Sequence, residues 1–140
     1  NNGDNYYEIE NTNGIKLSRS DMSALAQAKA ANYCGQSIAI KRSGLGINEF
    51  KHLFLSGGFA NYINVDNAKK IGFLIDTPNA NILKIGNSAL NGAIIFLVNV
   101  DERIKIESIV KTIKHVELET DVNFFDHFVE GCQFKELKVM

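Results

Sequence analysis

The stretch HLFLSGGFAN, at residues 52–61, decides the fold of this chain. A short apolar run stops at the pair Gly57-Gly58, and a helix is expected to begin at Phe59. A strand that ends in two glycines lets a ligand approach the bare backbone, and the first turn of a helix offers unpaired N–H groups to an anion. The pattern therefore predicts a site for a phosphate or for the edge of a nucleotide.

A second glycine block, GNSALNGA at residues 86–93, follows another apolar run at residues 82–85. Asn87 or Ser88 can cap a helix that runs to Asn99. A glycine inside a helix costs about 1 kcal/mol relative to alanine, so Gly92 calls for a packing reason. We expect another helix to pack closely against a face made of Ala89, Gly92, Ala93 and Phe96.

Strands and helices alternate along the rest of the chain. Apolar spacing and capping side chains predict further helices at residues 22–41 after Ser20-Asp21, at 65–70 after Asn64, at 101–113 with Asp101 as cap, and at 121–131 after Thr120. The first of these is expected to end at Ser43-Gly44. Short strands are predicted at residues 14–18, 50–56, 82–85 and 116–118, those at 50–56 and 82–85 as inner strands. This alternation predicts an α/β fold with at least a partly parallel sheet.

Two of the predicted helices carry apolar faces that we expect to form core rather than a cofactor site. They are Ile106, Ile109, Val110 and Ile113 in one helix, and Phe124, Phe125, Phe128 and Val129 in the last.

Composition limits the class of protein. The 140 residues are 45% hydrophobic and 22% charged, which suits one globular core. Fifteen basic and sixteen acidic residues give a net charge of -1, without a basic run that could follow nucleic acid. The longest apolar stretch, residues 93–98, is far below the roughly 20 residues of a membrane span, so a cytoplasmic protein without membrane contact is expected. Because the chain begins at Asn1, it reads as a piece of a larger protein.

Cysteines and histidines supply no predicted chemistry. Cys34 and Cys132 lie far apart without a CxxC spacing, so we expect buried thiols rather than a disulfide or a metal site. The three histidines fall in different elements and near no nucleophile: His52, His115 and His127. No catalytic residue and no metal ligand is predicted.

Five blocks in order carry a resemblance to a known family. They are DMSALAQAKAA (21–31), LSGGFANYIN (55–64), AKKIGFL (68–74), IGNSALNGAIIFL (85–97) and VELETDVNFFDHFVEGCQF (116–134). The chain from Gly14 onward resembles the C-terminal part of the reductive activators of corrinoid proteins, which belong to the superfamily of acetate and sugar kinases, heat-shock chaperones and actin. The resemblance implies that residues 14–140 form a ribonuclease H-like, actin-like ATPase C-terminal lobe, a mixed sheet with flanking helices. Residues 1–13 lie outside it, as a flexible N-terminal remnant of the parent chain.

The resemblance also implies site residues. Gly57 and Gly58, with Phe59 beside them, correspond to the adenosine motif, and Lys29 falls on the long helix at a position near the nucleotide. Residues 86–93 correspond to the connecting helix at the interdomain hinge. Ala60 stands where the family often has glycine and Ile75 where it often has proline; Ala60 should be tolerated only if its φ is negative.

For function, the resemblance implies a parent protein that uses ATP, with Mg, to drive electrons from an iron-sulfur cluster in its N-terminal part to an inactive cobalt(II) corrinoid protein, which returns to cobalt(I). A corrinoid protein is the implied partner, and homodimer formation is left open. The chain alone, without cluster cysteines or phosphate loops, should be inactive. Two alternatives stay open: an interaction or dimerisation module with a structural Gly-Gly turn, and the lobe of a sugar or acyl kinase relative, which would need a catalytic Asp. The upstream sequence would separate them.

Overall fold

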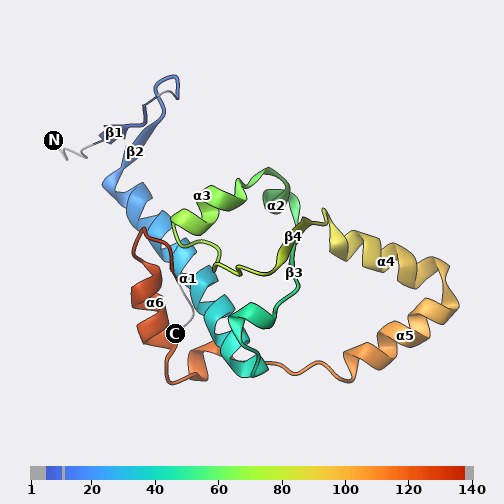
Figure 1. Cartoon of the computed structure of the whole chain (residues 1–140). Helices are drawn as coiled ribbons and strands as arrows, with labels where there is room; N and C mark the ends of the chain where they lie inside the picture. The colour runs from blue at the N-terminus through green and yellow to red at the C-terminus, as the bar shows by residue number, and fades with distance from the viewer. Residues whose placement is uncertain (1–5, 11, 138–140) are drawn as a thin grey trace.

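The computed structural model describes residues 6–10 and 12–137. Its elements follow the order β1 (Tyr6–Glu8), β2 (Lys16–Ser18), α1 (Arg19–Ser43), η1 (Ile47–Glu49), β3 (His52–Leu55), α2 (Gly58–Tyr62), α3 (Val65–Lys70), β4 (Asn81–Lys84), α4 (Ser88–Val98), α5 (Val100–Val110), η2 (Leu118–Thr120) and α6 (Phe124–Gly131). Figure 1 shows α6 lying along α1, while α4 and α5 project away from them. Among the described helices, none is long and apolar enough to cross a membrane.

The long helix α1 is defined by its two ends. Ser18 and Asp21 form a capping box, in which the Ser18 side chain accepts from the Asp21 N–H and the Asp21 carboxylate accepts from the Ser18 N–H. Gly44 closes the helix in the left-handed conformation, with φ of 72°. The predicted end is confirmed, but the helix begins earlier than predicted, since Ser18 rather than Ser20-Asp21 is the cap.

The sheets are small. β3 and β4 are parallel, with His52 opposite Asn81, which confirms the prediction of an at least partly parallel sheet. β1 and β2 form a separate antiparallel pair. The prediction that β3 and β4 are inner strands is wrong for the described residues, because each has one strand neighbour and Phe54 is 57% exposed.

The core lies between α1 and α6. Ala30, Tyr33, Cys34 and Ile38 of α1 are buried, and Tyr33 packs with Ile75 and Leu137. The face of α6 that meets α1 contains His127 and Gly131. The predicted core positions Phe125 and Val129 are wrong, since they are 72% and 51% exposed.

Several other boundaries differ from prediction. α5 is capped by Asn99 instead of Asp101, and it ends at Val110, so that Ile113 lies beyond it. Residues 116–118 form no strand; η2 follows instead. α2 begins at Gly58 rather than at Phe59. The helices predicted after Asn64 and Asn87 are confirmed, and each asparagine side chain accepts a hydrogen bond from a backbone N–H in the first turn of its helix.

The helices α4 and α5 form what we call the α4–α5 arm, residues 88–110. Its joint is held by Arg103, whose Nε donates to the carbonyl of Phe96 over 3.1 Å and whose guanidinium lies 5.1 Å from the centroid of the same phenyl ring. Most of the arm's apolar side chains face solvent in the described structure, including Leu97 and Val98 at 72% and 77% exposure.

Candidate functional site

The two glycine turns meet at the carboxyl ends of β3 and β4. Gly57 follows β3 with φ of 96°, Gly86 follows β4 with φ of 63°, and the Gly57 N–H donates to the Gly86 carbonyl over 2.8 Å. Parallel strands bring their carboxyl ends to one edge, which is where ligands bind in open α/β sheets. We call this place the glycine edge: Ser56, Gly57, Gly58, Gly86 and Ser88.

Hydroxyl groups tie the two turns together. The Ser56 Oγ donates to the Gly86 carbonyl over 3.2 Å and lies 2.5 Å from the Ser88 Oγ. Ser88 begins α4, and Gly58 begins α2, so two helix starts share this edge. The first N–H groups of α2 have no side-chain cap and are donors of the kind that hold anionic oxygens, whereas the Ser88 N–H and the Ser56 hydroxyl already donate to the Gly86 carbonyl. Sequence reasoning assigned no ligand contact to Ser56 or Ser88, although Ser56 precedes Gly57-Gly58 and Ser88 lies within the block 86–93.

Backbone conformation requires glycine at position 57 but not at position 58. Gly57 combines φ of 96° with ψ of 164°, a backbone conformation that is essentially restricted to glycine. Gly58 has no positive φ, and a Cβ built on it meets no atom within 4 Å. The fold therefore demands glycine at position 57 but leaves open space above position 58.

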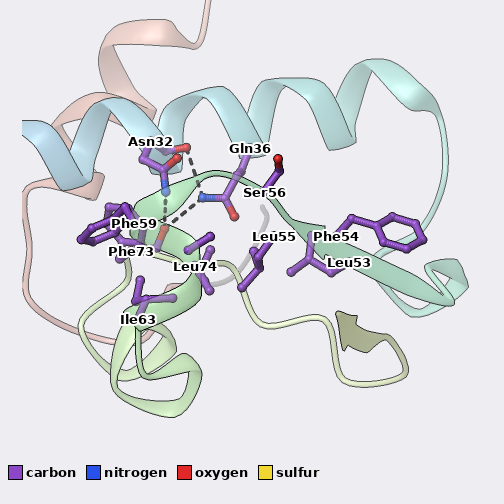
Figure 2. Close-up of a pocket in the computed structure, with 11 residues that line it drawn as sticks. Asn32, Gln36, Leu53, Phe54, Leu55, Ser56, Phe59, Ile63, Phe73 and Leu74 are labelled. Carbon is purple, nitrogen blue, oxygen red and sulfur yellow. Dashed lines mark hydrogen bonds between the residues drawn. The ribbon is translucent and has the colours of Figure 1, made fainter. Parts of the chain in front are cut away.

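Phe59 lines a pocket of about 380 Å³ between α1 and β3, which we call the α1–β3 pocket (Figure 2). Its walls are mostly apolar: Asn32, Gln36, Leu53, Phe54, Leu55, Ser56, Phe59, Ala60, Ile63, Phe73 and Leu74. Asn32 and Gln36 both donate from their side-chain amides to the Phe73 carbonyl, over 2.7 and 2.9 Å. The Phe59 and Phe73 rings meet edge to face, with centroids 5.7 Å apart.

The backbone at position 60 tolerates alanine in place of glycine. The one described non-glycine residue with positive φ is Asn13, so the φ of Ala60 is negative, as its sequence position required. Its small side chain is buried.

Lys29 does not line the α1–β3 pocket. It is fully buried between α1 and α6, where its Nζ donates to the carbonyls of Gly131 and Gln133 and lies 5.3 Å from the centroid of the Phe134 ring. Burial lowers the pKa of the Lys29 ammonium. The structure thus brings together Gly57, Gly58 and Phe59 but not Lys29, whose nucleotide contact stays a prediction.

The cysteines and histidines hold no cluster. Cys34 is buried and Cys132 half-buried, and both are free thiols; burial raises the pKa of Cys34. Within residues 6–10 and 12–137, no group of three or more His, Cys, Asp or Glu side chains is placed to hold a metal ion.

The chain matches the sequence family described as the C-terminal domain of RACo, the ASKHA domain, over residues 4–140. It is 31% identical over 139 residues to the corrinoid activation enzyme RamQ of Eubacterium limosum, in an alignment that covers 95% of this chain and 23% of that protein. The chain therefore spans about a quarter of the length of this relative. The relationship to activators of corrinoid proteins, carried by the five sequence blocks, is confirmed.

Proposed function

Because the chain belongs to the family of the C-terminal ASKHA domain of RACo, we propose that it is the nucleotide-binding lobe of a longer protein that activates corrinoid proteins. The proposed lobe has the ribonuclease H-like, actin-like ATPase fold and comprises residues 14–140, with residues 1–13 joining it to the rest of the parent chain. The mixed α/β architecture and the small parallel sheet are compatible with this fold.

In this proposal, the parent protein couples ATP and Mg to electron transfer from its own iron-sulfur cluster to a corrinoid protein. Cobalt(II) gains one electron and becomes cobalt(I). ATP acts by favouring one conformation of the activator, because a ligand shifts an equilibrium toward the state that it binds more tightly. The lobe contributes nucleotide binding and no cluster ligand.

At the glycine edge, the backbone of Gly57-Gly58 would face the nucleotide, and Phe59 would supply an apolar surface beside it. The uncapped N–H groups at the start of α2 suit an anionic ligand. One observation carries the proposal: Gly58 lacks a side chain although neither its φ nor its neighbours require this. A ligand that must approach the backbone accounts for the missing Cβ.

Gly58→Val in the full-length parent tests the proposal. The new side chain has room in the folded chain, so the fold should persist, while the path to the backbone is blocked. We expect ATP affinity to fall at least about 100-fold, a loss of roughly 2.7 kcal/mol, by isothermal titration calorimetry.

The matched control is Asn61→Val, which adds the same side chain to an exposed position of α2. It should leave ATP affinity nearly unchanged. Undiminished affinity in a folded Gly58→Val protein would reduce the Gly-Gly pair to a structural turn and support the interaction-module alternative.

A further inference from the structure

Lys84, the last residue of β4, ties that strand to the end of α2. Its Nζ donates to the carbonyl of Asn61 over 3.2 Å and to the carbonyl of Ile63 over 2.7 Å. The last carbonyls of a helix have no partner within the helix and carry partial negative charge, so a lysine ammonium suits them. Figure 1 shows α2 beside the end of β4, where this contact is made.

The helix α2 depends on such contacts because it is short. It has five residues, and isolated helices of fewer than about 12 residues are marginal in water. Ala60 is its one buried residue, and the ring of Phe59 meets that of Phe73. At the start of the helix, the Gly57 N–H donates to the carbonyl of Gly86, in the turn that follows β4. The strand β4 and its turn therefore hold α2 at both ends.

The direction of α2 matters for a ligand at the glycine edge. The first N–H groups of a helix point along its axis, so a contact that fixes the axis also aims these donors. Gly58 begins α2 and Tyr62 ends it, about 6 Å further along the axis at about 1.5 Å per residue. The contact with Lys84 at one end of α2 thus sets the direction of the donors at the other.

We propose that Lys84 is a positioning residue of the nucleotide site. By holding the last carbonyls of α2 against β4, it aims the N–H groups at the start of α2 toward the anionic oxygens of the nucleotide. This inference rests on the proposed function, in which the Gly57-Gly58 backbone faces ATP. Lys84 acts through the backbone of α2 rather than by contact with the nucleotide.

ATP titration of the full-length protein by calorimetry tests the inference. Lys84→Met removes the donors and the charge but keeps an unbranched side chain, and we expect ATP affinity to fall about tenfold or more. Because Lys84 and Asn61 are exposed, water can bind the freed carbonyls and the fold should persist. Lys84→Arg should keep the affinity within about threefold of the wild type, since arginine also binds the last carbonyls of a helix.

The matched control is Lys70→Met, which removes the same charge from an exposed position at the end of α3. Its ATP affinity should stay within about twofold of the wild type. An equal affinity in Lys84→Met and in the control would overturn the inference.

Two measurements separate positioning from long-range attraction. At about 1 M salt the Debye length is about 3 Å, so a loss caused by the missing charge alone should vanish, whereas a loss caused by a misdirected helix should persist. In amide hydrogen exchange, the Ile63 N–H, which donates to the Phe59 carbonyl, should lose protection in Lys84→Met on the order of tenfold, while the Gly57 N–H keeps it. A loss of affinity that disappears at high salt, or unchanged protection of Ile63, would contradict a positioning role.

The wild type distinguishes a failure of this inference from a failure of the proposed function. Wild-type protein that does not bind ATP would refute the nucleotide site itself and the inference with it. ATP binding by the wild type that Lys84→Met leaves unchanged would refute the role of Lys84 alone and leave the Gly57-Gly58 site standing.

Discussion

At the scale of single residues, Lys29 shows how a buried charge can hold two helices together. Its ammonium group binds the carbonyls of Gly131 and Gln133 at the end of α6. Helix ends leave carbonyls unpaired and carry partial negative charge, so a cation is favoured there. The partner lies 102 residues along the chain, and the sequence around Lys29 contains no sign of it. The sequence could therefore identify a lysine on α1 but not its surroundings.

Asp121 gives a prediction about pH. Its carboxylate accepts from the Asn123 N–H over 3.0 Å and from two nitrogens of Arg42 over 2.8 and 3.1 Å, and these contacts lower the pKa of Asp121 below its usual 3.8. Below pH 3.8 the unfolded chain then binds more protons at this position than the folded chain, so the stabilisation is complete above that pH and is lost as the pH falls further.

The measurement compares the free energy of unfolding of the wild type and Asp121→Asn from about pH 6 down to about pH 2. The variant should be less stable at the higher pH, and the difference should shrink below about pH 4. Asp126→Asn, at an exposed position of the following helix α6, is the control and should show a smaller difference. A difference for Asp121 that stays constant down to pH 2 would contradict the assignment.

At the scale of elements, the contact of α1 with α6 depends on a glycine. A Cβ on Gly131 would lie 2.8 Å from the Ala30 Cα, which is too close for backbone that cannot move aside. We expect Gly131→Ala to destabilise the chain by about 1–3 kcal/mol, as an overpacked contact does.

Urea unfolding measures this effect, with Gly92→Ala in α4 as the matched control. A Cβ on Gly92 meets nothing within 4 Å in the described structure, so helix propensity alone should stabilise the control by up to about 1 kcal/mol. A stabilising change in Gly131→Ala, like that expected for the control, would mean that the close approach of α6 to α1 at Gly131 does not exist in solution.

Local signals explain which elements could be predicted from the sequence. The caps at Asn64 and Asn87 and the stop at Gly44 were correct because a cap is a contact within a few residues. Phe125 and Val129 were wrongly predicted to face the core, because the close approach of Gly131 to the distant Ala30 turns the side of α6 with His127 toward α1. Periodicity gives a helix an apolar side but does not say which side meets a neighbour.

The glycine edge shows the same division. The sequence predicted two strand–glycine–helix units, and the structure forms both. It could not predict that Gly57 would donate to Gly86, because the pairing of two strands is a long-range event. Nor could it separate the two neighbouring glycines, since the requirement for glycine at 57 and the open space at 58 appear only in the backbone geometry.

At the scale of the whole molecule, the α4–α5 arm exposes an apolar surface to solvent. Apolar side chains are exposed along both helices: Leu90, Ile94, Ile95, Leu97, Val98, Val100, Ile104, Ile109 and Val110. Exposed apolar surface of this extent marks an interaction site rather than a solvent face. Under the proposed function, we expect the rest of the longer protein to cover it, in line with the prediction that residues 86–93 form a connecting helix.

Gly92→Leu, measured in two contexts, tests that expectation. In the 140-residue chain the leucine side chain enters open space. Helix propensity should then raise the free energy of unfolding by up to about 1 kcal/mol, and the urea midpoint should rise with it. In the full-length protein, a helix packed against Ala89, Gly92 and Ala93 would be forced away, and stability should fall by about 1–3 kcal/mol.

Asn91→Leu, at the neighbouring exposed position of α4, controls for the added side chain and should change little in either context. Opposite signs for Gly92→Leu in the two proteins would locate the interface at this face of α4, whereas a stabilising change in both would show that Gly92 stays exposed to solvent in the complete protein.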